Sequence, residues 1–140
     1  MKRHLAVVVI LIMTSGCAEP PAQQSQTTAP AVTSAKPADE PAAIRVIGEI
    51  NKAQAGYIQR NRRYALTYDE LVESHFLAKE PSKDATGYEI SLRPSADAVS
   101  YRVLASPVSP SPSVRHFYSD KTGVIRAETG KEATVASPEI

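Results

Sequence analysis

The sequence predicts an α+β fold class, in which a long N-terminal amphipathic helix packs on a small antiparallel sheet. Two observations support this prediction: apolar residues recur at spacings of three and four between residues 42 and 60, and they alternate with polar residues after residue 87. We therefore expect one folded domain over residues 42–128. The C-terminal tail, residues 129–140, lacks such periodicity and is expected to fray.

The first element of the domain is expected to be an amphipathic helix of about 20 residues. It opens at Glu40 and Pro41, because proline needs no amide donor in a first helical turn and an acidic side chain suits the positive end of the helix dipole. Gly48 and Gly56 weaken the helix by about 1 kcal/mol each relative to alanine, so packing must hold it. The residues that form its inward stripe are Ile44, Ile47, Ile50, Gln54, Tyr57 and Ile58.

A short second helix is expected to follow. Thr67 and Glu70 have the spacing of a capping box, in which the threonine side chain bonds forward and the glutamate side chain bonds back to the backbone amide of Thr67. The side chains expected to point inward from this segment are Leu71, Val72, Phe76 and Leu77.

Two antiparallel hairpins are expected in the second half of the domain. The first turns at residues 95–98, and its alternating apolar residues are Tyr88, Ile90, Leu92, Val99, Tyr101 and Val103. The second pairs residues 115–119 with residues 124–127 around a turn from Asp120 to Gly123. Glycine at the end of this turn can supply a positive φ.

Residues 1–16 have the order of an export signal. Lys2 and Arg3 precede an apolar run over residues 5–13, and small residues follow up to Cys17. The run is about half of the roughly 20 residues that a membrane-spanning helix needs, which excludes a transmembrane interpretation of this segment.

The stretch from Met13 to Cys17 resembles a bacterial lipobox, with Ser15 and Gly16 at the small positions and Thr14 where leucine is usual. The resemblance implies cleavage before Cys17 and covalent attachment of diacylglycerol and an N-acyl chain, which together would anchor the protein permanently. A conventional signal that happens to contain a cysteine is the alternative. We expect an exported protein on the cell membrane or outer membrane, with its domain facing the periplasm or the cell exterior.

Residues 17–41 are expected to form a disordered tether behind the lipidated cysteine. The tether is rich in Pro, Ala, Gln and Thr, and Val32 is its only branched aliphatic residue. Such a segment buries too little apolar surface to offset the entropy lost on ordering.

Four local patterns, in this order along the chain, resemble a type IV pilin or pseudopilin headpiece. They are Ala53-Gln54-x-x-Tyr57, Tyr64-Ala65-x-x-Tyr68-x-x-Leu71, Gly87-Tyr88-x-Ile90-x-Leu92 and Phe117-Tyr118-Ser-Asp120-x-Thr-Gly123-Val-Ile-Arg126. The resemblance covers roughly residues 42–138. The chain departs from pilins at its N-terminus, where Cys17 and the tether replace the prepilin peptidase site and the long apolar half of the helix.

The resemblance implies a non-catalytic interaction or structural module, displayed on a membrane and bound to an unidentified envelope protein partner. A pseudopilin-related component of a pilus or of a type II secretion-like assembly is the alternative. Nucleic acid is not an expected partner, because 16 basic residues face 15 acidic ones. The densest basic cluster, Arg60, Arg62 and Arg63, lies where the long helix should end, and cations there suit the helix dipole.

No catalytic residue is expected, and no small-molecule substrate is evident. The best set for an envelope hydrolase, the least favoured function, would combine His116 and Asp120 with one of the serines. However, Ser119 lies outside any nucleophile-elbow sequence, and no glycine-rich oxyanion loop accompanies it. Alternation places His116 and Tyr118 on one strand face, which a hairpin explains without chemistry.

No metal or other cofactor is expected beyond the lipid on Cys17, and a calcium site in the last hairpin is the less favoured alternative. Some major pseudopilins bind Ca²⁺ in a loop near the C-terminal end, so the resemblance makes Asp120 and Thr122 weak candidate ligands. Calcium needs several oxygen ligands, and Asp120 is the only carboxylate nearby. We expect Asp120 to stabilise the turn instead.

Overall fold

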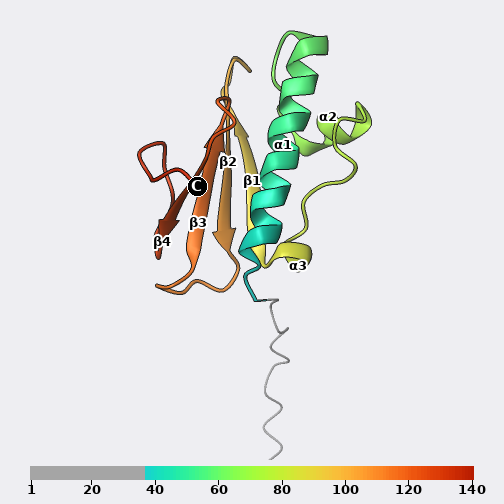
Figure 1. Ribbon diagram of the computed structural model, residues 1–140. Helices are drawn as coiled ribbons and strands as arrows, with labels where there is room; N and C mark the ends of the chain where they lie inside the picture. Colours follow the sequence, from blue (N-terminus) through green and yellow to red (C-terminus); the bar gives the residue numbers. More distant parts are fainter. Residues whose placement is uncertain (1–36) are drawn as a thin grey trace, which may run out of the picture. The chain divides into compact units, whose positions relative to one another are not determined.

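The computed structural model describes residues 37–140, which have an α+β fold (Figure 1). A four-stranded antiparallel sheet packs against a long helix, as the sequence predicts. Residues 1–36, which contain the expected signal and most of the expected tether, lie outside the described residues. Within residues 37–140, none of the helices has the length and apolar character required to cross a bilayer.

Helix α1 (Glu40–Asn61) begins two residues before the domain boundary expected from the sequence. Asp39 is its N-cap, and its side chain accepts a hydrogen bond of 3.0 Å from the Ala42 amide. Glu40 then pairs with Arg115 of the sheet at 2.6 Å. The folded part of the chain therefore begins before residue 42, within the range expected for the tether, because Asp39 caps the helix and Glu40 binds it to the sheet.

The sheet consists of four strands in sequence order, β1 (Tyr88–Pro94), β2 (Tyr101–Pro107), β3 (Arg115–Asp120) and β4 (Ile125–Thr129). Every neighbouring pair is antiparallel. Two short helices, α2 (Tyr68–Glu73) and α3 (Lys83–Thr86), lie between α1 and β1 in the chain. Both predicted hairpins are therefore present.

The main core lies between α1 and one face of the sheet. Ile47 and Ile50 of α1 are fully buried, together with Tyr88, Val103 and Phe117 of the strands. The predicted inward stripe of α1 is confirmed at four of its members, which are Ile47, Ile50, Gln54 and Tyr57. Ile44 and Ile58 are only partly buried.

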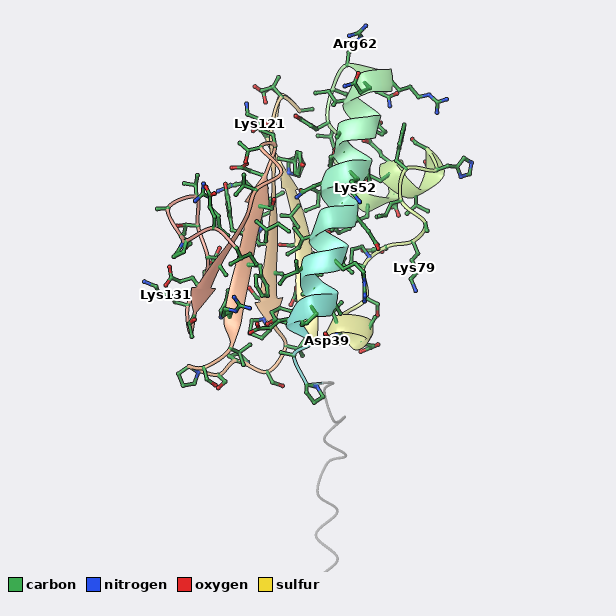
Figure 2. All side chains as sticks on the ribbon, in the orientation of Figure 1. Asp39, Lys52, Arg62, Lys79, Lys121 and Lys131 are labelled. Carbon is green, nitrogen blue, oxygen red and sulfur yellow. The ribbon has the colours of Figure 1, made fainter. Side chains whose placement is uncertain are left out.

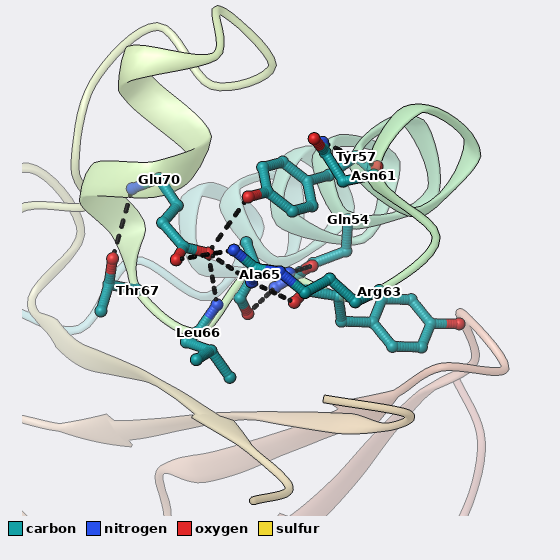
Figure 3. Close-up of polar contacts among 9 residues, drawn as sticks. Gln54, Tyr57, Asn61, Arg63, Ala65, Leu66, Thr67 and Glu70 are labelled. Atoms are coloured by element: carbon teal, nitrogen blue, oxygen red, sulfur yellow. Dashed lines mark hydrogen bonds and ion pairs between the residues drawn. The ribbon is translucent and has the colours of Figure 1, made fainter. Parts of the chain in front are cut away.

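A polar network fastens α2 and its preceding loop to the end of α1 (Figure 3). The buried Gln54 side chain accepts from the Ala65 amide at 2.9 Å and donates to the Ala65 carbonyl at 3.1 Å. Thr67 bonds forward to the Glu70 amide, as predicted. The backward half of the predicted capping box is wrong, because the Glu70 carboxylate accepts from the Leu66 amide and from Arg63 instead.

Two expectations for the second half of the domain are wrong. Val99 is 60% exposed and lies outside the strands, because the first turn is two residues longer than expected and includes Val99, with Ala98 at a φ of +55°. The C-terminal tail does not fray: Ala127 and Ile125 of β4 exchange backbone hydrogen bonds with Pro138 and Ile140. The tail thus pairs with the outer edge of β4. A segment held by a few backbone hydrogen bonds needs no repeating apolar pattern, so hydrophobic periodicity could not predict it.

Candidate interaction surface

The candidate lipidation site, Cys17, lies outside the described residues. Its attachment to lipid therefore stays a prediction.

Asp120 and Thr122, the weak candidates for a calcium site, lie in the turn between β3 and β4. One carboxylate oxygen of Asp120 accepts from the Thr122 amide at 2.9 Å and from the Thr122 hydroxyl at 2.7 Å. The Gly123 amide donates to the Asp120 carbonyl, and Gly123 has the positive φ that the sequence predicted. These bonds are the ones expected of a turn-stabilising aspartate. Within residues 37–140, no three His, Cys, Asp or Glu side chains gather as metal ligands would.

The environment of Asp120 keeps its carboxylate ionised. Partial burial acts to raise the pKa of Asp120, but hydrogen bonds from Thr122 and from the Tyr118 hydroxyl outweigh it and lower the pKa below its ordinary value. The turn therefore carries one fixed negative charge at neutral pH.

Ser119, the serine considered for a hydrolase, does not face His116. Ser119 is fully buried on the helix side of β3, where its hydroxyl donates to the Val124 carbonyl at 2.9 Å and accepts from Asn51 at 2.8 Å. His116 is an odd number of residues away on the same strand and therefore faces the opposite side of the sheet. The Ser119 hydroxyl and the His116 ring thus cannot form a nucleophile and base pair.

The face of the sheet opposite α1 remains open across β1 and β2. In Figure 1 the helices and the C-terminal segment lie at opposite sides of the sheet. Three adjoining hollows of about 400, 220 and 140 Å³ cross this open face and share wall residues such as Arg93, Arg102 and Leu104. We call this continuous depression the sheet groove. The residues used below to describe it are Glu89, Ser91, Arg93, Arg102, Leu104, Ser106, Lys121 and Glu132.

One end of the sheet groove, next to the hairpin turns, is basic. Arg93 of β1 lies directly opposite Arg102 of β2, and Lys121 lines the same hollow. Both arginines are exposed, and neither has an ion-pair partner within the part of the chain that the structure describes. Like charges directly opposite each other on a sheet are destabilising. Arg102 is also the Cα partner of Asp120 on β3, which offsets part of its charge on that side. The facing of Arg93 and Arg102 itself works against folding.

The remainder of the sheet groove changes character along the strands. Ser91 of β1 lies opposite Leu104 of β2, which gives the middle a small aliphatic surface. Glu89, opposite Ser106, and Glu132 of the C-terminal segment line the far hollow, whose wall Arg93 also reaches. The sheet groove thus runs from a basic end, through an aliphatic middle, to an acidic end.

The C-terminal segment forms one wall of the sheet groove. Glu132, Thr134 and Val135 line the hollow between this segment and β2. Ala133 and Ser137 are buried and hold the segment in place, with the Ser137 hydroxyl donating to Glu128 at 3.0 Å. The wall is therefore made by residues that we had expected to fray.

Sequence reasoning missed the arginine pair because it made the first turn two residues too short. A turn at residues 95–98 would put Arg93 opposite Ser100, whereas the observed register puts it opposite Arg102. The available signal was Ser95, whose hydroxyl bonds to both the amide and the carbonyl of Ser100 and so closes a longer turn.

Comparison of the chain with protein-family models, curated proteins and solved structures finds no match.

Proposed function

We propose that this protein is an exported envelope lipoprotein that displays a non-catalytic, pilin-like interaction module. The sheet groove would be its binding surface. We base the interaction role on one observation: a strand face that could have been covered or neutralised stays open and carries the opposed arginines Arg93 and Arg102. Proteins that depart from otherwise consistent design rules commonly do so at functional sites.

The lipid anchor is supported by the order of the N-terminal sequence. An apolar run, small residues and Cys17 precede a Pro-rich and Gln-rich segment without a further apolar run before the domain. The pilin-like assignment is supported by the element order, because a long capped helix and a short helix precede an antiparallel sheet.

The N-terminal end of the described domain lies far from the basic end of the sheet groove. Asp39 and Lys121 lie at opposite ends of the domain (Figure 2). A chain that is tethered through residues before Asp39 would therefore hold the basic end of the sheet groove away from the point of attachment. A partner approaching from beyond the membrane surface could reach it.

The anchor is tested by metabolic labelling with a fatty-acid analogue. The wild type should incorporate label and Cys17→Ser should not, because no other residue offers the thiol that the lipid requires. Equal label on the two proteins would contradict the lipoprotein assignment.

The interaction role is tested separately by photo-crosslinking in intact cells. A photoreactive residue replacing Ser91, in the sheet groove, should give a discrete adduct with another envelope protein. The same residue replacing Glu49, on the exposed side of α1, is the matched control and should not. Adducts from Glu49 alone, or from neither position, would contradict the proposed binding surface.

A further inference from the structure

We propose that the sheet groove binds an extended peptide segment of a partner protein. In this segment an aliphatic residue lies between an acidic residue and a basic residue, and the two charged residues can stand in either order. This inference rests on the proposed interaction function and names the chemistry of the partner.

The basic end of the sheet groove has an excess of positive charge that a single carboxylate would balance. Arg93, Arg102 and Lys121 supply three cations there, while Asp120 in the same hollow and Asp97 near Lys121 supply two anions. Hydrogen bonds from Ser95 and Val99, with a smaller effect of Lys121, lower the pKa of Asp97.

The two arginines are arranged to hold one carboxylate between them. They are Cα partners in the β1 and β2 register, and side chains directly opposite on a sheet are about 5 Å apart at Cβ. Asp120 is the Cα partner of Arg102 on β3, on the side of β2 away from Arg93, so it is not placed between the two arginines. A carboxylate placed between the guanidinium groups could accept charge-assisted hydrogen bonds from both and remove their mutual repulsion.

The acidic end of the sheet groove would be complemented by a positively charged residue of the peptide. Glu89 and Glu132 line the far hollow, with no ion-pair partner among the residues that the structure describes. Glu89 is four residues before Arg93 on β1, a separation of about 13 Å along a strand. An extended peptide of about five residues spans this distance. Leu104, between the two ends, would contact an aliphatic side chain at the centre of such a segment.

A segment of mixed charge fits the sheet groove better than a uniform polyanion. A phosphate polymer that followed the depression would meet Glu89 and Glu132 after leaving Arg93 and Arg102. Repulsion at the acidic end would then oppose attraction at the basic end. Protein segments are the common polymers that carry both charges and an aliphatic side chain within five residues.

The proposal is tested by titrating the full chain, as purified from cells in detergent, with three peptides while amide chemical shifts are recorded. The peptides are Asp-Ser-Val-Ser-Lys, its all-acidic analogue Asp-Ser-Val-Ser-Asp and its all-basic analogue Lys-Ser-Val-Ser-Lys. We expect the mixed peptide to bind most tightly and to shift amides of Ser91, Arg93, Arg102 and Leu104. The order of its charges is not decisive, because an extended peptide can lie in either direction.

Two variants with the same loss of charge provide the control. Arg93→Gln with Arg102→Gln should weaken binding of the mixed peptide about tenfold, since it removes both charge-assisted contacts. Arg45→Gln with Lys52→Gln, on the exposed side of α1, should leave the affinity unchanged. Because all four residues are exposed, each variant should retain its fold, which the amide spectrum reports directly.

Several outcomes would overturn the peptide proposal. They are equal or tighter binding of the all-acidic peptide or of inorganic polyphosphate, absence of groove shifts at millimolar mixed peptide, and concentration-dependent shifts that reveal a second copy of this chain in the groove. If crosslinks from Ser91 form in cells while the mixed peptide does not bind, the proposed interaction function stands and only the partner's chemistry is wrong.

Discussion

The two faces of the sheet are built from the same strands but differ in what their side chains contact. On the helix side, Tyr88, Val103 and Phe117 are buried with α1 in one apolar cluster. On the groove side, Glu89 and Arg102, each the direct neighbour of a buried residue, are exposed. Alternation along each strand therefore separates a packed face from a face that meets solvent.

The two faces should therefore contribute differently to stability and to recognition of a partner. Burial of apolar surface contributes about 25 cal/mol per Å² to folding, so the helix side supplies most of the stabilising free energy. The groove side contains exposed polar residues and an opposed arginine pair, neither of which adds appreciably to it. Substitutions on the two faces should therefore have different consequences.

The largest effect is expected for Ile47→Asp on the helix side. Ile47 is fully buried, and an unpaired carboxylate in that position costs several kcal/mol, comparable with the whole stability of a small domain. We expect the variant to be unfolded at 25 °C by circular dichroism. Glu49→Gln, two residues along and exposed, should melt within a few degrees of wild type. Similar melting of the two variants would show that the buried side of α1 is wrongly assigned.

Alanine substitutions at two glycines of α1 should change the free energy of unfolding by less than Ile47→Asp does, and in opposite directions. A Cβ on Gly56 would lie 2.7 Å from the Phe76 ring, whereas a Cβ on Gly48 would have nothing within 4 Å. We expect Gly48→Ala to raise the free energy of unfolding by about 1 kcal/mol through helix propensity. Gly56→Ala should lower it, because the clash displaces Phe76 from the cluster around Tyr57. Equal stabilisation in both denaturant titrations would contradict this packing.

A pH-dependent effect is expected for Glu70→Gln. The bidentate hydrogen bonds from Arg63 are the main cause that lowers the pKa of Glu70, and the Leu66 amide adds to them. A carboxylate with a lowered pKa in the folded state stabilises the domain above its ordinary pKa of about 4.3 and loses this contribution as the pH falls through its folded-state value. The variant should therefore melt below wild type at pH 7, and the gap should narrow in acid. A gap that is constant down to pH 3 would exclude this role.

Asp120→Asn should change stability by less than about 0.5 kcal/mol, since an asparagine oxygen can accept the same bonds from Thr122. Neither millimolar Ca²⁺ nor a chelator should move the melting temperature of the wild type. A rise of several degrees with calcium that disappears in Asp120→Asn would instead identify a metal ligand.

The elements with strong periodicity could be predicted from the sequence. The stripe through Ile47 and Ile50 predicted α1, and alternation around Tyr88 and Tyr101 predicted the first two strands. The spacing of Thr67 and Glu70 predicted the start of α2, but only its forward bond formed. The Glu70 side chain accepts hydrogen bonds from Arg63 and does not bond back to the Thr67 amide.

The candidate binding surface could not be predicted because it depends on register and on a segment without periodicity. A turn that is two residues shorter than the observed one places Arg93 opposite Ser100 and not opposite Arg102. The wall made by Ala133 and Val135 depends on a few bonds between the tail and β4, such as that from Ala127 to Pro138. Such long-range contacts leave no local pattern in the sequence.

The separation of the two faces is tested most directly by the free energy of unfolding of the variant Arg93→Gln with Arg102→Gln, measured by denaturant titration at low salt. If the groove side serves recognition, removing the opposed charges should leave this free energy equal to that of wild type or raise it slightly. Their repulsion is relieved, and the exposed pairing of Arg102 with Asp120 that is lost contributes little. A loss of more than about 1 kcal/mol would contradict the account, since it would show that the arginines hold the fold together.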